Sequence, residues 1–599
     1  MRTKDIFSFR RCCFFVIQIL ILTSVVFFIS YPQSKDCMII GYIFDSDSNK
    51  KTEALVDIGD IIISDGQFTE NLPFGNHRIK ITKGFEYEPI DTVITINDNK
   101  PKELNFYLKR FVNMKSFGWY NGELHYHLFH DTSGYKVNPD SLILLGKAVG
   151  LDYFALAHSW GVENPTPELL NSLFHKNENE FILTWNMEMP KNYWKGDVSF
   201  CLGHCWYIGA EGYTKTGKNI IDELYAMNAH DYELEKIPTP NFDSISLIKS
   251  LGGISIYAHP LSSWYGKWGG RNNYPIENNK FISNLSQELP FNTVIGPLYD
   301  GIDILYRNHS RDDEKLYYML LNKGYRIAGT ATSDGAFMNE RGTRAYPGIY
   351  RTYTYISEDF SISNITKNIK KGRNIVTNGA LILFSIDNNI PGDIILADGK
   401  KRVAKVKAWA SGSTKTSLNS ITIIRNGDIF KEFQVPQNKK EFEVSFEIEE
   451  KDNSWYIAKC YDSNKKIGIT NPIFFENKSF SPPKPTQAYV KVKVYDKFKK
   501  NLLPVHVEIL NYIGRDISIT KSFEEKNGEF TLNCPATARI KVSSPGYKSQ
   551  TKSIFIDYNP LLEMNLNIKK EDIIKWDTYE KIMKMLKEVV IEFPLEKED

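Results

Sequence analysis

The 599-residue sequence predicts an α/β domain in the middle of the chain, with β-sandwich domains before and after it. Between residues 115 and 395, short apolar runs alternate with stretches of helical spacing, which is typical of an α/β barrel or a doubly wound sheet. On either side, short apolar runs separated by turn signals are typical of β-sandwiches. The composition, 42% hydrophobic and 24% charged residues, excludes disorder, collagen and coiled coil for the chain as a whole.

Charge and cysteine content exclude further classes of protein. Lys and Arg number 74 against 72 Asp and Glu, a formal charge of +2, whereas nucleic-acid-binding domains usually carry a basic face. Seven cysteines in a chain of this length are too few for a disulfide scaffold. We therefore expect no nucleic acid among the partners, and the sequence predicts no particular protein partner.

The N-terminus predicts export. Residues 1–11 carry four cationic side chains and one anionic, and an apolar run from Cys12 to Ile29 follows. The run is long for a cleaved signal and just long enough for one membrane span. We expect residues 1–34 to be a signal peptide or a signal anchor, the second with membrane anchorage through residues 12–30. The protein is then periplasmic, at the cell surface or secreted.

Residues 37–112 predict a small β-sandwich, and a related pattern returns at 486–570. Residues 65–69 read DGQFT and residues 527–531 read NGEFT, and Gly66 is separated from Gly84 by the same number of residues as Gly528 from Gly546. This indicates one β module used twice, and the pattern resembles the carboxypeptidase regulatory-like sandwich. Residues 400–478 predict a further β-sandwich. Apolar side chains at helical spacing predict a C-terminal helix within 571–599 that packs on a neighbouring domain.

Histidines and acidic residues recur where the predicted strands of the middle domain end, which is where barrels carry their chemistry. His125 and His127 are two apart on one predicted strand, so their side chains share a face and can hold one ion. The other members of the set are His158, Glu188, His204, His259 and Asp334. Imidazole and carboxylate together suit Zn, Mn or Fe.

The stretch Gly118–His127, GWYNGELHYH, is similar to the opening of PHP-fold metallohydrolases, and specifically of the CehA/McbA family. Further similar segments, in the same order, are 150–156, 203–204, 252–254, 258–260, 332–334, 347–353 and 372–379. The resemblance implies a PHP-type distorted (β/α)7 barrel, flanked here by N-terminal and C-terminal β-sandwich domains. It also implies one to three metal ions and hydrolysis of esters, amides, carbamates or phosphoesters, with amide-bond formation in one type of member.

Two of the usual ligand positions of the fold are altered in this chain. PHP proteins usually have Asp-His where Ala157-His158 stands, and a histidine where Ala336 stands. We therefore expect one or two divalent ions, with Zn favoured over Mn or Fe. Because a full three-metal centre suits phosphoesters, the loss favours an ester, amide or carbamate bond.

The predicted metal ligands are His125, His127, Glu188, His204, His259 and Asp334. A metal-activated water would be the nucleophile, and Glu188 is either a ligand or the general base. His158 is a ligand, a general acid or base, or an outer-sphere residue. Asp131 is a further catalytic candidate, although acidic turn residues often only cap loops.

Three residues are candidates for substrate contact. Arg351 can bind an anionic group through two hydrogen bonds, or it forms a structural salt bridge. Trp160 and Trp264 stand near His158 and His259 in the sequence, and either line an aromatic pocket for a sugar ring or aryl group or simply fill the barrel. A small-molecule or glycan-derived substrate suits such a pocket.

The sequence thus predicts an exported metal-dependent hydrolase of ester, amide or carbamate bonds. The alternatives are a phosphoesterase, formation of an amide bond, and a cell-surface glycan-binding protein whose barrel has lost its activity.

Overall fold

The structure is a computed structural model of the chain. It describes residues 36–127, 139–158, 177–178, 181–189, 192–195, 198–201, 204–210, 217–220, 223–224, 241–261, 288–296, 298–307, 309, 311–338, 342–343, 346–412, 415–514, 516–554 and 570–598. The predicted N-terminal segment 1–34 lies outside these residues. Within them, no helix combines the length and the apolar character needed to cross a membrane.

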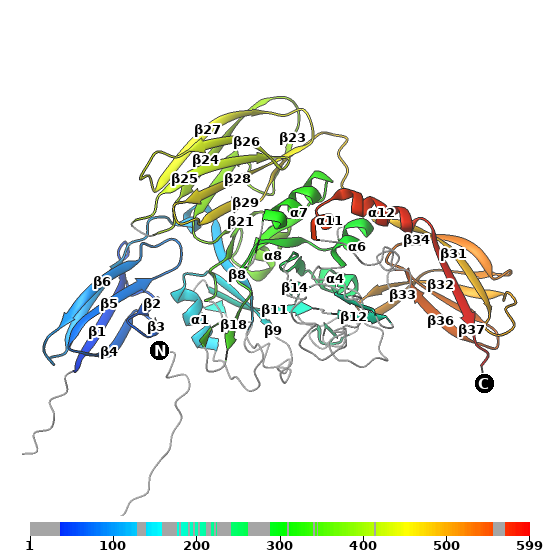
Figure 1. The fold of residues 1–599 in the computed structure, drawn as a ribbon, viewed down its shortest axis with the longest axis horizontal. Helices are drawn as coiled ribbons and strands as arrows, with labels where there is room; N and C mark the ends of the chain where they lie inside the picture. The colour runs from blue at the N-terminus through cyan, green and yellow to red at the C-terminus, as the bar shows by residue number, and fades with distance from the viewer. Residues whose placement is uncertain are drawn as a thin grey trace, which may run out of the picture. The chain divides into compact units, whose positions relative to one another are not determined.

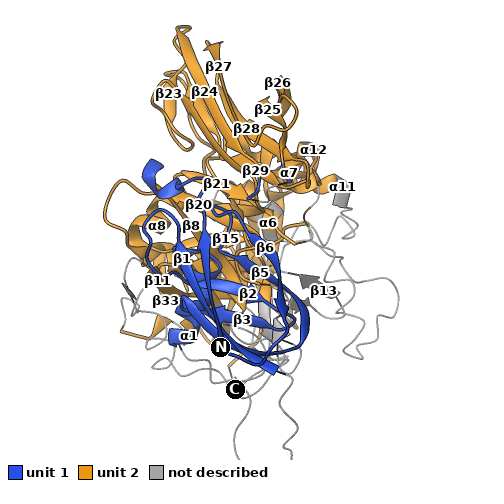
Figure 2. Cartoon of the chain, turned by 90° about the vertical axis from the view of Figure 1, so that its left-hand side faces the viewer, with its two compact units in different colours: residues 1–117, 136–152, 411–416 blue, residues 118–135, 153–410, 417–599 orange. Residues whose placement is uncertain are grey.

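The chain divides into two compact units (Figure 2). One comprises residues 1–117, 136–152 and 411–416, and the other comprises residues 118–135, 153–410 and 417–599. Helix α1 (Pro139–Ala148) therefore groups with the N-terminal strands, although the sequence predicted a domain boundary near residue 115.

The first unit contains a β-sandwich of two sheets. Their strand orders are β4-β1-β7 and β3-β2-β5-β6. The strands are β1 (Asp36–Asp45), β2 (Ala54–Asp57), β3 (Ile61–Ser64), β4 (Gln67–Pro73), β5 (Gly75–Thr82), β6 (Ile90–Ile96) and β7 (Lys102–Leu108), followed by a 3-10 turn, η2 (Met114–Phe117). Ile43 and Phe106 from one sheet meet Val56 and Ile81 from the other in one buried cluster. Buried residues alternate with more exposed ones along β1, β2 and β3, as expected of strands with one face in a core.

The C-terminal module repeats this topology strand for strand. Its sheets are β34-β31-β37 and β33-β32-β35-β36, and β31 pairs in parallel with β37 just as β1 does with β7. The strands are β31 (Gln487–Asp496), β32 (Val505–Ile513), β33 (Asp516–Glu525), β34 (Glu529–Pro535), β35 (Arg539–Ser544), β36 (Tyr547–Ser553) and β37 (Val589–Leu595). The two segments that share a sequence pattern thus share a strand order.

The prediction of helix to the C-terminus is wrong for its last part. Helices α11 (Lys570–Ile573) and α12 (Trp576–Leu586) lie between β36 and β37, and α12 contacts α6 of the middle domain. After Leu586 the chain forms β37, in which buried and exposed residues alternate. That alternation matches pairing with β31, so tertiary pairing outweighs the helical spacing seen in the sequence.

The third β region starts earlier in the chain than predicted. Strand β22 (Leu381–Ile386) pairs with β24 (Lys401–Trp409), which pairs with β27 (Glu441–Glu449). The other strands of this region are β23 (Ile394–Leu396), β25 (Leu418–Arg425), β26 (Asp428–Gln434), β28 (Ser454–Asp462), β29 (Ile467–Thr470) and β30 (Ile473–Glu476). Because β22 and β23 pair with strands of this region, the middle domain ends before residue 395.

The middle domain is built on a mixed sheet whose pairings run β18-β8-β9-β11-β14-β15-β16-β17. Strands β8, β9, β11, β14 and β18 of this sheet are labelled in Figure 1. Its strands are β8 (Trp119–His127), β9 (Tyr153–His158), β11 (Phe181–Met189), β14 (Cys205–Ile208), β15 (Ile254–Tyr257), β16 (Gly301–Leu305), β17 (Ala328–Ala331), β18 (Gly335–Met338), β20 (Arg351–Tyr355) and β21 (Asn374–Thr377). Short strands β10 (Asn177–Glu178), β12 (Asn192–Lys195), β13 (Val198–Cys201) and β19 (Gly342–Thr343) and helices α4 (Asn241–Ser250), α6 (Glu288–Ile295), α7 (Arg311–Asn322) and α8 (Ile362–Lys370) complete it.

This sheet departs from an ideal parallel barrel. Neighbouring strands β8, β9 and β11 are parallel, as are β15, β16 and β17, but β14 runs antiparallel to both of its neighbours and β20 runs antiparallel to β8. Full closure of the predicted (β/α)7 barrel is not established by these pairings. Only three residues, 332–334, separate β17 from β18, which pairs with β8. The end of β17 is therefore brought beside the end of β8.

Candidate metal centre

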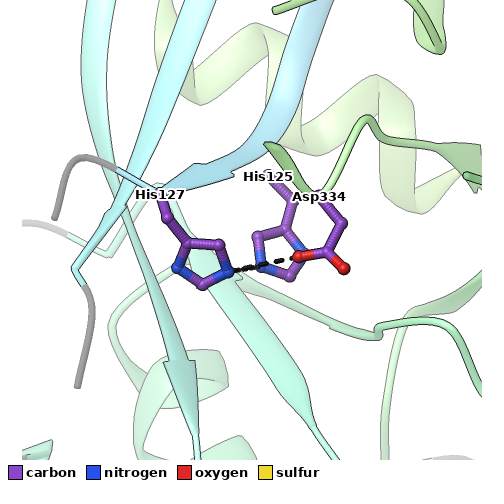
Figure 3. A group of neighbouring side chains, drawn as sticks. All are labelled: His125, His127 and Asp334. Atoms are coloured by element: carbon purple, nitrogen blue, oxygen red, sulfur yellow. Dashed lines mark hydrogen bonds and ion pairs between the residues drawn. The ribbon is translucent and has the colours of Figure 1, made fainter. Parts of the chain in front are cut away.

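The structure brings together all six residues predicted as metal ligands. They form two groups, His125 with His127 and Asp334, and Glu188 with His204 and His259, and within each group the candidate ligand atoms all lie within 4.8 Å of one another. Figure 3 shows the imidazoles of His125 and His127 and the carboxylate of Asp334 turned toward one another. The residues come from the ends of β8, β11, β14 and β15 and from the turn between β17 and β18.

Local backbone geometry explains how these side chains converge. His125 and His127 share one face of β8. Ala258 N donates to His204 O at 2.9 Å, which holds the segment before β14 beside the end of β15. His259 and Asp334 have φ angles of 31° and 44°, a left-handed conformation that is uncommon outside glycine. Backbone strain of this kind clusters at functional sites.

Glu188 connects the two groups. Its Oε2 lies 3.7 Å from His125 Nε2 and 3.4 Å from His127 Nε2, and its Oε1 lies 3.3 Å from His259 Nε2. Oε1 also contacts His204 Nδ1. One buried carboxylate thus contacts four imidazoles, two from the end of β8 and one each from residues next to β14 and β15.

Burial and charge shift the pKa values of the cluster in opposite directions. Burial alone would lower the pKa of His125, but the Glu188 carboxylate outweighs it and raises this pKa to about 9. Burial lowers the pKa of His127. Burial also opposes the charged form of Asp334, yet the imidazoles of His127, His259 and His125 hold its pKa well below the usual range. The carboxylates and imidazoles are thus strongly coupled through charge.

The donor set fits a divalent cation. His125 Nε2 and His127 Nε2 face each other at 3.2 Å, and His127 Nε2 lies 3.3 Å from Asp334 Oδ1. Three candidate ligand atoms that converge on one point are the arrangement of a coordination site, and imidazole with carboxylate suits Zn, Mn or Fe. His125 Nδ1 is buried and has no hydrogen-bond partner among the described residues. Two groups sharing Glu188 provide for one or two ions.

Sequence reasoning missed Glu123, a buried residue of β8 two positions before His125. Its carboxylate is fully buried and accepts backbone N–H groups of His125 at 3.1 Å, Ser333 at 3.1 Å and Gly348 at 2.9 Å. Burial raises its pKa to about 7, although these hydrogen bonds oppose the rise. The available sequence signal was its position two residues before His125 on a predicted strand. In the structure, the pairing of β8 with β9 shifts register between Glu123 and Tyr126.

Asp303 of β16 is a second buried carboxylate that the sequence reasoning missed. It accepts hydrogen bonds from Trp206 Nε1 at 3.2 Å, Thr330 Oγ1 at 2.7 Å and Thr332 Oγ1 at 2.9 Å. Burial raises its pKa, and the positive charge of His125 opposes that rise. A lone acidic residue between Ile302 and Ile304 was the only sequence signal.

The other predicted site residues are placed as follows. Arg351 is 2% exposed, and its guanidinium donates to Gly348 O at 2.7 Å and to Asn121 Oδ1 at 2.9 Å, which favours a structural role over substrate contact. His158 ends β9, where its backbone pairs with Met187, and its side chain lies outside the description. Asp131, Trp160 and Trp264 also lie outside the described residues.

No family model matches the chain, and no curated protein matches it. A two-domain protein from Bacteroides vulgatus that contains a predicted PHP-like metal-dependent phosphoesterase is similar at 12% identity over 57% of this chain and 91% of that one, with a TM-score of 0.28. A putative metal-dependent phosphoesterase from Bifidobacterium adolescentis is similar at 14% identity over 36% of this chain and 86% of that one, with a TM-score of 0.21. Similarity this low establishes neither a shared fold nor a shared activity.

Proposed function

We propose that the protein is a metal-dependent hydrolase whose centre holds one or two divalent ions. The observation that carries this proposal is the Glu188 carboxylate in contact with four imidazoles, with Asp334 beside His127. Gathering this many buried titratable groups is costly unless they are paired or coordinate a metal. The proposed ligands are His125, His127, Glu188, His204, His259 and Asp334.

A divalent ion at such a site lowers the pKa of water and polarises a carbonyl or phosphoryl group. The residues of the chain orient the reactants and manage the protons. Glu188 is placed to hold the imidazoles in position, and its carboxylate is the proposed acceptor of the proton from the attacking water if it is not itself bound to the ion. The buried Glu123 and Asp303 support the backbone and side chains around the site.

We favour an ester, amide or carbamate as the bond that is cleaved. The support is the donor set, in which Ala336 stands where a further histidine is usual in PHP proteins. The backbone of Ala336 pairs with that of His127 at the edge of the centre. A phosphoester is the alternative that the experiment must test.

Metal analysis coupled to a substrate panel tests the proposal. The purified protein is dialysed against Zn, Mn or Fe, its metal content is measured, and aryl esters, amides, carbamates and phosphate esters are supplied. We expect one or two ions per chain and turnover of a carbonyl substrate. Replacing both His125 and His127 with Ala should remove metal and activity, whereas replacing the exposed His506 should leave both unchanged.

Three results would count against parts of the proposal. Trace metal that is unaffected by the double replacement refutes the metal centre. Turnover of phosphate esters alone establishes the phosphoesterase and refutes the carbonyl preference. Full metal loading without turnover of any substrate class refutes the hydrolase and favours a binding protein.

We also propose that residues 1–34 direct export. Fractionation of cells that express the full chain, followed by N-terminal sequencing, distinguishes a cleaved signal from an anchor. A full-length chain in the cytosolic fraction refutes export.

A further inference from the structure

We infer that Glu123 is a positioning residue that holds Asp334 in place, so that its loss weakens metal binding by the His125–His127–Asp334 group specifically. This inference rests on the proposed metal centre. It concerns a side chain that contacts backbone groups rather than any candidate ligand atom.

The Glu123 carboxylate joins three separate segments of the chain. It accepts the N–H of His125 two residues along β8, the N–H of Ser333 in the turn after β17, and the N–H of Gly348 in the loop before β20. Ser333 N lies within reach of both carboxylate oxygens, at 3.1 and 3.3 Å. The segments that carry Ser333 and Gly348 are more than two hundred residues away in the sequence.

The Ser333–Asp334 turn has a strained backbone, and hydrogen bonds to neighbouring segments hold it in place. We call the Glu123 carboxylate, which accepts one of these bonds, the anchor of the turn. Asp334 has a φ of 44°, which a residue with a side chain adopts at a cost. Asp334 N donates to His125 O at 3.1 Å, and Ser333 Oγ accepts from Tyr350 N at 3.3 Å. These contacts tie the turn to β8 and to the loop before β20, and the contact from Ser333 N to Glu123 completes the set.

The chemistry of the anchor requires a carboxylate. The carboxyl group of Glu123 offers acceptor sites on two oxygens, so it can accept three converging N–H groups. A glutamine of the same size has one acceptor oxygen and an NH₂ group that points donors at donors. Ser333 N can reach the single side-chain oxygen of E123Q in either orientation of the amide, so the NH₂ group faces the N–H of Gly348 or of His125 instead. That buried N–H loses its acceptor, and the segments that hold the Ser333–Asp334 turn are pushed apart.

Displacement of the turn affects one group of candidate ligands more than the other. Asp334 Oδ1 lies 3.3 Å from His127 Nε2, and both belong to the first group. Glu188, His204 and His259 lie at β11, before β14 and after β15. Within the described part of the chain, the Glu123 carboxylate hydrogen-bonds to His125, Ser333 and Gly348 and to none of these three residues. Partners that orient metal ligands typically contribute about 10- to 100-fold in metal affinity.

The experiment compares E123Q with D334N and E450Q in the full chain. Metal stoichiometry and the dissociation constant of each ion are measured by competition with a chelator, and the unfolding temperature is measured on metal-free protein. Glu450 is also a buried carboxylate, but it is held by Arg425 in the third β region, so E450Q controls for the general cost of losing a buried charge.

We expect E123Q to bind one ion about 10- to 100-fold more weakly and to reproduce the metal pattern of D334N. E450Q should bind metal as the wild type does. If E123Q does not fold, E123D, which keeps the charge but shortens the reach, should show the same selective loss. Metal binding by a folded E123Q or E123D equal to that of the wild type overturns the inference, as does an equal loss in E123Q and E450Q. A wild type that binds no ion refutes the proposed function instead.

Discussion

Replacing Glu188 with Gln should weaken every ion that the centre holds, because this carboxylate contacts members of both groups. Glu188 lies within 3.7 Å of the imidazoles of His125, His127 and His259 and also contacts His204, whereas Asp334 contacts His127. Four-ligand zinc sites bind with about 10–16 kcal/mol, or about 2.5–4 kcal/mol for each ligand. That corresponds to about a 10²- to 10³-fold change in dissociation constant for each ion.

The assay compares E188Q with D334N by calorimetric titration of Zn into metal-free protein. We expect both binding events to weaken in E188Q and one to weaken in D334N. Because Gln has nearly the same shape as Glu, the comparison changes charge rather than packing. Equal effects of the two substitutions on each ion would refute the reasoning, since they would mean that Glu188 does not connect the groups. His506, which is exposed on β32, supplies the control substitution.

Two further predictions concern stability. Hydrogen bonds from Arg425 and Tyr456 outweigh burial and hold the pKa of Glu450 below its usual range, so the stability it contributes is present above pH about 4.5 and is lost as the pH falls through the lower folded pKa. The free energy of unfolding of E450Q at pH 7, measured with denaturant, should thus lie about 1–3 kcal/mol below that of the wild type. A difference that fails to narrow below pH about 4 contradicts this account. Asn471 is fully buried, accepts from Gly329 N at 2.7 Å and donates to Gly329 O at 2.8 Å. N471A should lower the free energy of unfolding, measured with denaturant, by about 2–4 kcal/mol, because the N–H and C=O of Gly329 both lose a hydrogen-bond partner. A loss below about 1 kcal/mol would refute this role of Asn471 in stabilising β17.

The set of candidate ligands was predictable from the sequence because its signals are local. A strand places residues two apart on one face, which identified His125 and His127 as a pair. Strand ends are marked by the last residue of an apolar run, which identified His259 and Asp334. These rules need only a few neighbouring residues, and the structure places all six predicted ligands in the two groups.

The supporting residues were not predictable in this way. The role of Glu123 depends on Ser333 and Gly348, and the buried position of Arg351 depends on Asn121, each of them distant in the chain. The strand character of β37 likewise depends on pairing with β31, which the sequence spacing of its apolar residues does not reveal.

The sequence by itself therefore predicted which side chains gather at the candidate metal centre, the alternation of strands and helices in the middle domain, and the reuse of one β module at both ends of the chain. Only the tertiary structure decided that Glu188 connects the two groups, that Glu123 anchors the turn before Asp334, and that the chain after Leu586 returns to a sheet. The physical reason is that the spacing of apolar and polar side chains, which predicts strands and helices, depends only on residues close together in the sequence. Hydrogen bonds to buried carboxylates and strand pairing are made between residues that only the folded chain brings together.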